Sequence, residues 1–160
     1  MHIRQAIAAD ADILAELNRD VQQLHADAAP HLFKQPDDLS PVAADFLTRV
    51  LTDPDGFTFI AEDESGPVGY IYARLVQRPE NAYNHAYRLL HIDQISVKPA
   101  SRGRGYGRAL MEAAYGVARE AGIQLVTLDT WAFNADALAF YAHLGFKPMV
   151  YRLQLTEAGG

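Results

Sequence analysis

The chain has 160 residues, of which 49% are hydrophobic and 21% are charged, and its formal net charge is −6. This length and balance are those of one globular domain and exclude a disordered chain, while the acidic charge argues against a general nucleic-acid-binding surface. Because there is no cysteine, disulfides, thiolate metal sites and a cysteine nucleophile are excluded, and we predict no metal site. The start lacks a signal-peptide pattern and no run approaches the ~20 apolar residues of a membrane span, which predicts a cytoplasmic protein.

The first third of the chain predicts one strand and two helices. Residues 1–7 alternate apolar and polar side chains, as a half-buried strand does. Apolar residues at helical spacing follow Asp10, a residue type that caps helix N-termini, and predict a helix that ends near residue 28. After a loop with two prolines, Ser40-Pro41 provides a cap and a first-turn proline for a second helix, to about Leu51.

The middle of the chain predicts three strands and a helix. Residues 57–63 and 68–77 predict strands joined by a tight turn, and residues 87–97 predict a third strand after a longer connection. A helix is expected from about Tyr106 to Glu120. Gly122 follows it, in the position where glycine commonly ends a helix.

The last third predicts a strand, a short helix and a final strand. Residues 123–131 form a near-continuous apolar run, which is typical of a strand buried on both faces in the centre of a sheet. A short helix is expected between Asn134, its cap, and Gly145, where it stops. Residues 147–155 predict the last strand, followed by a frayed tail.

This element order predicts a mixed α/β fold in a single domain over residues 1–160. Its sheet should be antiparallel in the N-terminal part and gain a parallel pair on either side of the helix that follows the glycine-rich stretch, with helices on both faces.

The glycine-rich stretch "RGRGYGR", Arg102 to Arg108, lies between a strand and a helix. A helix N-terminus presents backbone N–H groups without partners and a partial positive charge, so it favours anions. Gly103, Gly105 and Gly107 would let the chain approach a phosphate closely, and the arginines add donors suited to phosphate oxygens. The stretch therefore predicts a pyrophosphate-binding loop.

Other phosphate- and RNA-binding patterns fit this stretch less well. A Walker loop would need Gly-Lys-Ser/Thr, and the dinucleotide pattern would need a glycine where Arg108 or Leu110 stands. Arginine-glycine segments that bind RNA are repetitive and disordered, whereas this stretch occurs once between two predicted elements. A simple turn would need one glycine, not three.

Two segments together resemble the GNAT superfamily of N-acetyltransferases. "ISVKPASRGRGYGRALMEAA" is similar to its acetyl-CoA-binding segment, in which Arg102 to Gly107 match the pattern Gln/Arg-x-x-Gly-x-Gly/Ala. "WAFNADALAFYAHLGF" matches its second hallmark, an asparagine before Phe-Tyr and Leu-Gly-Phe. The resemblance covers essentially the whole chain and implies the GNAT fold, with acetyl-CoA as co-substrate.

The resemblance also implies positions for the cofactor site. The amides of the glycine loop would hold the pyrophosphate, and the strand before it would pair its main chain with the pantetheine arm. Asn134 would contact the cofactor or only cap its helix. Tyr141 would be the general acid that protonates the coenzyme A thiolate, or a half-buried core tyrosine. The implied cofactor-binding residues are Ile95, Ser96, Val97, Arg102, Gly103, Arg104, Gly105, Tyr106, Gly107, Arg108, Asn134 and Tyr141.

Acetyl transfer to an amine also needs a base, because an ammonium has no lone pair. Alternation places His91, Asp93, Ile95 and Val97 on one face of the strand 87–97. Asp93 falls where similar polyamine acetyltransferases carry a glutamate base, and His91 is a residue type suited to proton transfer near neutral pH. Either residue could be the base, Asp93 could instead bind a cationic substrate, or both could lie at a solvated sheet edge.

The acceptor is expected to be the primary amine of a small molecule, with protein amines as the alternative. The resemblance implies that residues 24–38 and 78–87 help to shape its pocket, and their aromatic and acidic side chains suit an alkylammonium. Without a cysteine for a thioester intermediate, we predict direct transfer in a ternary complex. A non-catalytic acyl-CoA-binding or regulatory module on the same fold is the competing function, and a homodimer is possible.

Overall fold

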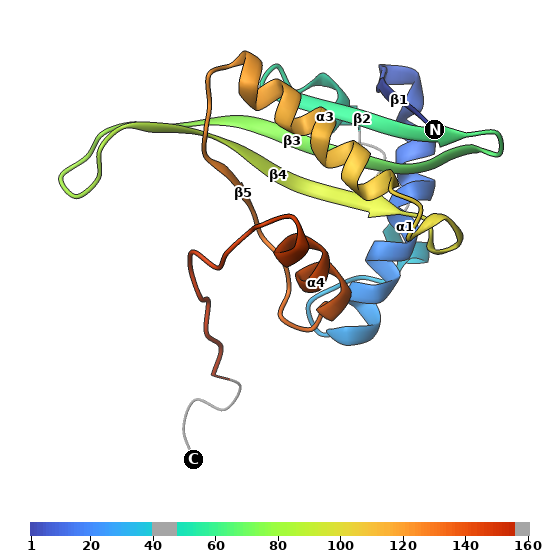
Figure 1. The fold of residues 1–160 in the computed structure, drawn as a ribbon. Helices are drawn as coiled ribbons and strands as arrows, with labels where there is room; N and C mark the ends of the chain where they lie inside the picture. Colours follow the sequence, from blue (N-terminus) through green and yellow to red (C-terminus); the bar gives the residue numbers. More distant parts are fainter. Residues whose placement is uncertain (40–47, 156–160) are drawn as a thin grey trace. The chain divides into compact units, whose positions relative to one another are not determined.

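The computed structural model describes residues 1–39 and 48–155. Contacts between residues divide the chain into two compact units, Met1–Asp129 and Thr130–Gly160. The first unit contains a five-stranded sheet in the order β1-β2-β3-β4-β5 together with two long helices (Figure 1). Its strands and long helices are β1 (His2–Gln5), α1 (Ala11–Ala28), β2 (Gly56–Asp63), β3 (Gly66–Arg78), β4 (Tyr87–Val97), α3 (Tyr106–Glu120) and β5 (Val126–Leu128). In the second unit, the described residues form one helix, α4 (Ala135–His143).

The sheet has the mixed topology that the sequence predicts. Strands β1 to β4 are antiparallel neighbours, and β4 pairs in parallel with β5. The glycine-rich stretch and α3 lie in the connection between these two parallel strands, because a parallel pair needs a crossover of this kind. The predicted mixed α/β fold is confirmed.

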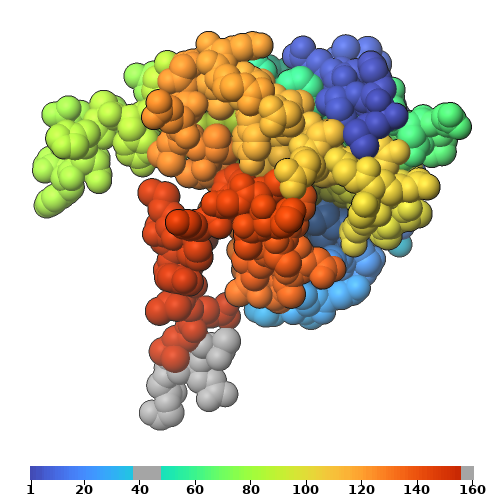
Figure 2. Space-filling model, viewed as in Figure 1, coloured from blue at the N-terminus to red at the C-terminus, as the bar shows by residue number. Residues whose placement is uncertain are grey.

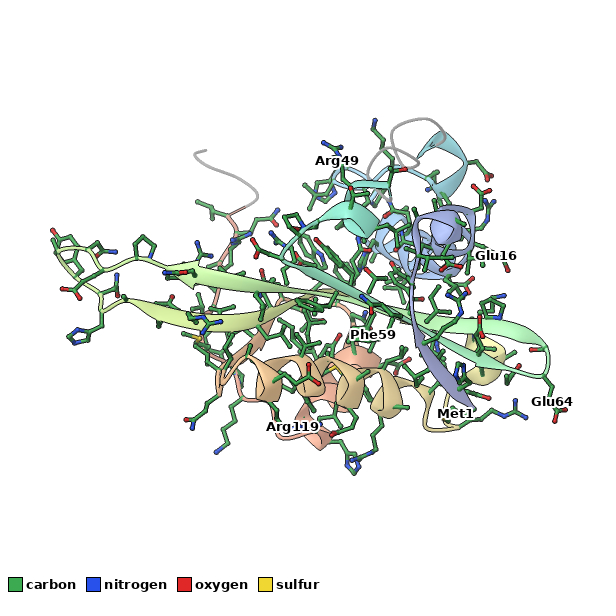
Figure 3. All side chains as sticks on the ribbon, turned by 90° about the horizontal axis from the view of Figure 1, so that it is seen from above. Met1, Glu16, Arg49, Phe59, Glu64 and Arg119 are labelled. Atoms are coloured by element: carbon green, nitrogen blue, oxygen red, sulfur yellow. The ribbon has the colours of Figure 1, made fainter. Side chains whose placement is uncertain are left out.

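Helices cover both faces of this sheet, with α1 on one side and α3 on the other (Figure 3). On the α1 side, Leu14 and Leu17 form a buried cluster with Ile60, Tyr70 and Tyr72 of the sheet. The helix α3 turns its own apolar stripe inward, where Leu110, Met111 and Ala114 are fully buried. Both helices therefore follow from apolar residues repeated at helical spacing.

The predicted helix from Tyr106 to Glu120 is confirmed residue for residue by α3. It begins after Gly105, whose φ is +90°, and Gly122 beyond its end has φ +65°. Both angles lie in the left-handed region, where a side chain is strained and glycine is favoured.

Two strand predictions near the C-terminus are wrong. The run 123–131 contains only the three-residue strand β5, which is half-buried and last in the strand order rather than central. Residues 147–155 form no strand in the structure. Of the helix predicted from Ser40, residues 40–47 lie outside the described part of the chain, and residues 48–52 are helical.

Asp10 precedes α1 as predicted, but its carboxylate does not cap that helix. Instead, its two oxygens accept hydrogen bonds from Arg4 at 2.7 and 2.8 Å, and one also accepts from the Ile7 amide at 2.8 Å. Arg4 in turn reaches Glu62 on β2 at 2.8 Å. These contacts lower the pKa of Asp10, chiefly through the Arg4 hydrogen bonds, and they fasten the start of α1 to β1.

Asp10→Asn should lower the free energy of unfolding at pH 7 by about 2 kcal/mol, because buried hydrogen bonds to a charged group are lost. The folded-state pKa of Asp10 lies below its ordinary value of 3.8, so its stabilising contribution is present above that value and disappears as the pH falls through the folded pKa. Urea unfolding at pH 7 and at pH 3 measures both effects. The difference between the two proteins should shrink at pH 3, and an equal difference at both pH values would contradict this account.

Candidate cofactor and catalytic site

The loop between β4 and α3 has the backbone shape of an anion-binding turn. Gly103 has φ +74° and Gly105 has φ +90°, so both positions require glycine. A Cβ atom placed on Gly103 would meet no protein atom within 4 Å. The space beside Gly103 is therefore open, and Figure 2 shows this part of the chain, in yellow, at the surface.

The amides of this loop have no acceptor in the described chain. Within residues 1–39 and 48–155, no backbone N–H from Gly103 to Arg108 donates a hydrogen bond, and the first bond of α3 runs from the Ala109 amide to the Gly105 carbonyl. No side chain caps the helix. Since unsatisfied helix N-termini attract anions, these six amides form the strongest candidate for a phosphate site.

The three arginines of the loop are exposed. Arg102 donates from Nε to the carbonyl of Val97 at 3.0 Å, which holds its guanidinium beside the end of β4. Arg102 also lines a hollow of about 570 Å³ that lies between the second half of α1 and the loop. The same hollow is also lined by Asp20 and Asp27 of α1, so the exposed arginines of the loop have carboxylates in their neighbourhood.

Tyr106, the first residue of α3, fastens the helix N-terminus to the sheet. Its side chain is buried, and its hydroxyl donates to Asp63 at the end of β2 at 2.9 Å. This hydrogen bond raises the pKa of the Tyr106 phenol. Because the Tyr106 side chain is buried and bonded to Asp63, we expect this residue to contact a cofactor through its backbone amide.

A β-bulge interrupts β4 between its ends. Gln94 faces Tyr72 on β3, whereas Ile92 faces Ala73, so Asp93 is an extra residue without a partner across the pair. Because of this extra residue, His91 lies opposite Arg74, whereas Ile95 lies opposite Ile71. Arg74 and Ile71 are three residues apart and therefore lie on opposite faces of β3.

The expectation that four side chains of β4 share one face is therefore wrong. Ile95 and Val97 point to one side of the sheet and His91 to the other, because a bulge shifts the alternation by one residue. The bulge also lets Ile92, which is buried, take the core position beside Ala73.

Asp93 is held by an arginine that the sequence did not single out. Its two carboxylate oxygens accept from Nε and Nη2 of Arg74, each at 2.7 Å. This bidentate pair is the strong form of an arginine–carboxylate contact, and it raises the pKa of Arg74. In the sequence, the only indication that Arg74 has a special role is its charge inside an otherwise apolar strand.

A second polar pair lies beside the first. Tyr72, two residues before Arg74 on the same face of β3, donates its hydroxyl to Asp53 at 2.7 Å. Both side chains pack closely against the backbone of Gly56, where an added Cβ would lie 2.8 Å from Asp53 and 2.9 Å from Tyr72. The hydrogen bond lowers the pKa of Asp53. Burial, followed by this hydrogen bond, raises the pKa of Tyr72.

His91 is placed by β5. Its Nδ1 lies 2.9 Å from the Thr127 hydroxyl, and the two residues face each other across the parallel pair. Among the described residues, no hydrogen bond involves its other ring nitrogen, Nε2. On the edge of β4 that is turned away from β3, the described residues provide a strand partner only at Leu90–Ile92, so the main chain from Asp93 to Ser96 has no strand partner there, while the Val97 carbonyl accepts from Arg102.

The second unit contains the remaining two predicted site residues. Asn134 caps α4, since its side-chain oxygen accepts from the Ala137 amide at 3.1 Å, which confirms the helix-cap interpretation. Tyr141 lies on α4 with its ring 5.4 Å from that of Phe140 and 5.9 Å from that of Phe146. Burial raises the pKa of the Tyr141 phenol to about 12.

The two segments expected to shape the acceptor pocket differ in position. Residues 29–39 follow α1, and Arg19 of that helix pairs with Asp37. Residues 78–87 form the exposed turn that joins β3 to β4 and projects from the sheet (Figure 1). The eleven residues of β4 separate this turn from the glycine loop by about 33 Å. The part of residues 24–38 and 78–87 in an acceptor pocket stays a prediction.

No helix in the described part of the chain is long and apolar enough to cross a membrane.

Comparisons with known proteins agree with this geometry. A mycothiol acetyltransferase of Amycolatopsis mediterranei is 34% identical over 98 residues, which cover 61% of this chain and 32% of that protein. The chain spans 32% to 40% of the length of three curated relatives, which are two mycothiol acetyltransferases and an uncharacterized N-acetyltransferase of Methanocaldococcus jannaschii.

Solved structures share the fold. A tetramutant of the BH1408 protein from Bacillus halodurans has a TM-score of 0.92 at 23% identity, and the match covers 98% of this chain and 100% of that one. The aminoglycoside N-acetyltransferase AAC(6')-Iy in complex with CoA has a TM-score of 0.75 at 18% identity, covering 98% and 93%. The model of the acetyltransferase (GNAT) family matches residues 18–146, and the chain therefore belongs to that family.

Proposed function

We propose that this protein transfers an acetyl group from acetyl-CoA to the primary amine of a small molecule, directly and within a ternary complex. The observation that carries the proposal is the run of unpaired amides from Gly103 to Arg108 at the N-terminus of α3. A diphosphate is the ligand chemistry that such amides and the neighbouring arginines suit.

The residues present fit acetyl-CoA. The open space at Gly103 admits a phosphate oxygen close to the backbone. The edge of β4 from Asp93 to Ser96, which has no strand partner there among the described residues, would offer amide and carbonyl groups to the pantetheine arm, an extended chain with amides of its own. Ile95, Ser96 and Val97 would contribute through their main chain, and Asn134 and Tyr141 are proposed on the cofactor side by family resemblance.

In the proposed reaction, the amine nitrogen attacks the thioester carbonyl carbon, a C–N bond forms and the C–S bond breaks. The amine loses a proton to a base, and the departing thiolate takes one from Tyr141. The products are an acetamide and coenzyme A. Because the pKa of Tyr141 is about 12, its phenol is protonated at neutral pH and can donate.

For the base, His91 is the better supported of the two candidates. Both carboxylate oxygens of Asp93 already accept hydrogen bonds from Arg74, which favours a role for Asp93 in orienting or binding the acceptor. His91 is held at Nδ1 by Thr127, which leaves Nε2 for proton transfer directly or through water.

The names of relatives support a small-molecule acceptor. They include enzymes called mycothiol acetyltransferase and streptothricin acetyltransferase, and a structural neighbour is an aminoglycoside N-acetyltransferase. Coenzyme A release measured against a panel of aminoglycosides, polyamines, amino acids and peptides tests the activity and the acceptor class together. Release with peptides alone would replace the small-molecule acceptor with a protein amine.

Gly103→Ala should weaken acetyl-CoA binding about tenfold, because the new Cβ enters the open space beside the amides and strains a residue at φ +74°. The matched control is Gly122→Ala at the other end of α3, where φ is +65° and a Cβ also meets no atom within 4 Å. Both variants should lose similar stability in thermal unfolding, of the order of 1 kcal/mol. Calorimetric titration should show weaker binding only for Gly103→Ala. Equal affinities in both variants, or no binding by the unaltered protein, would refute the phosphate site.

A further inference from the structure

A buried tyrosine connects α1 to two strands of the sheet. The side chain of Tyr70 on β3 is fully buried. Its hydroxyl lies 2.9 Å from the side-chain oxygen of Asn18 on α1 and 2.8 Å from that of Gln94 on β4. Burial raises the pKa of the Tyr70 phenol, so the hydroxyl keeps its one proton at neutral pH. Two side-chain amides therefore meet at a single hydroxyl.

One proton cannot be donated to two oxygens. The phenol donates to the oxygen of one amide, and the other amide then turns its NH₂ group to the phenol oxygen, which accepts. The first amide has its NH₂ group left over, and the second has its oxygen left over. Whichever amide takes which part, Asn18 and Gln94 together keep one donor and one acceptor without a partner.

These remaining amide groups are within reach of solvent. Both side chains are half-buried, and neither amide makes another hydrogen bond within residues 1–39 and 48–155. In this part of the chain, the only buried side-chain polar atom without a partner is the hydroxyl oxygen of Thr58. The remaining groups of Asn18 and Gln94 are therefore not sealed inside the protein, and a ligand can reach them.

The amide of Gln94 lies on the same face of the sheet as His91. Gln94 is opposite Tyr72 and His91 is opposite Arg74. Tyr72 and Arg74 are two residues apart on β3, so these side chains share a face. Two residues along a strand correspond to about 7 Å. A small molecule whose amine lies beside His91 can therefore bring a second polar group to Gln94.

The chemistry of the amide pair indicates what this second group is. An ammonium only donates and a carboxylate only accepts, whereas a hydroxyl does both. Because the two amides meet at one phenol oxygen, a compact group suits them better than an extended one.

We propose that Asn18 and Gln94 bind a hydroxyl group of the acceptor close to its reacting amine, so that the acceptor is an amino alcohol such as an amino sugar. This inference rests on the proposed acetyl transfer and names its substrate class. Asn18 and Gln94 determine the specificity. Tyr70 is a positioning residue, because its hydroxyl fixes how the two amides are turned.

A matched pair of amines tests the assignment. The compounds trans-2-aminocyclohexanol and cyclohexylamine share a ring and a primary amine, and only the first has a hydroxyl beside the amine. The value of kcat/KM is measured for each and corrected for the fraction of the amine that is neutral. For the unaltered enzyme, we expect it to be about tenfold higher for the amino alcohol, which is the effect of one or two hydrogen bonds.

Substitutions in the network should remove this preference. Gln94→Leu and Asn18→Leu each delete one amide and keep a side chain of similar size, so the ratio of the two kcat/KM values should fall to about one. Tyr70→Phe keeps the buried ring and leaves the amides free to turn, so the ratio should fall to about three. The matched control is Gln77→Leu, at an exposed position of β3 outside the network, which should keep the ratio. Calorimetric titration with acetyl-CoA checks that each variant is folded.

The outcomes separate this inference from the proposed function. A ratio near one in the unaltered enzyme, or a ratio that survives Gln94→Leu and Asn18→Leu, would overturn the amino-alcohol assignment while acetyl transfer stands. Coenzyme A release with polyamines or peptides and with no hydroxylated amine would do the same. If acetyl-CoA binds but no amine leads to release, the proposed acetyl transfer is itself contradicted, and this inference with it.

Discussion

Replacing Tyr141 by phenylalanine is expected to lower kcat about 100-fold while acetyl-CoA binds with unchanged affinity. The substitution removes one hydroxyl and keeps the ring that contacts Phe140 and Phe146, so α4 should retain its packing. With a pKa of about 12, the phenol holds its proton at neutral pH and can give it to the coenzyme A thiolate as the C–S bond breaks. Without that proton, the sulfur must leave as an unprotonated thiolate, and cleavage of the C–S bond is slower.

The matched control for Tyr141 is Tyr115→Phe on α3. Burial is the main cause that raises the pKa of Tyr115 as well, so the two substitutions remove chemically similar hydroxyl groups. Steady-state kinetics should show full activity for Tyr115→Phe, and calorimetry should give the same affinity for acetyl-CoA in both variants. If Tyr141→Phe turns over at the unaltered rate, Tyr141 is not the acid and a water molecule or another group protonates the thiolate.

The sequence predicts this fold well where local signals and tertiary packing agree. The start of α3 is marked by glycine at φ +90° and its end by glycine at φ +65°, and its apolar stripe is regular. The parallel pair follows from the strand, glycine loop and helix in succession. In such regions backbone preference and burial favour the same structure.

The bulge at Asp93 could not be predicted, because alternation assumes an uninterrupted strand. The extra residue in β4 has no partner across the strand pair. The contacts that compensate for this come from residues that are distant in the sequence. Ile92 fills the core beside Ala73, and the Asp93 carboxylate meets Arg74. The same holds for the hydrogen bond from Tyr72 to Asp53, which depends on how two strands pair. Partners of this kind are known only once the register is known.

The C-terminal segment, residues 147–155, illustrates a different limit. Its apolar alternation predicts a strand, but a strand exists only when a neighbour accepts its hydrogen bonds. Periodicity in the sequence reports which face would be buried and not which molecule buries it. For residues 123–131, the apolar run likewise predicted burial on both faces. Among the described residues, the structure pairs only Val126–Leu128, on one side, with β4.

His91→Gln is expected to lower kcat about 100-fold, and Asp93→Asn only three- to tenfold. Glutamine can keep a hydrogen bond to Thr127, so the packing of β4 against β5 should survive while the proton acceptor is lost. Asparagine at position 93 keeps the shape of the side chain and removes the charge that faces Arg74. The two substitutions therefore separate proton transfer from the positioning of charge.

The pH dependence distinguishes a missing base from a disturbed structure. Without a base, only the acceptor amine that is already neutral can react, and this fraction rises about tenfold for each pH unit below an amine pKa of about 10. The logarithm of kcat/KM for His91→Gln should therefore rise with a slope near one between pH 7 and pH 9, and the unaltered enzyme should rise less steeply. Thr127→Val should lie between the two, because His91 remains but loses the hydroxyl 2.9 Å from its Nδ1. A larger loss in Asp93→Asn than in His91→Gln, together with this steep slope, would make Asp93 the base and Arg74 the residue that must release it.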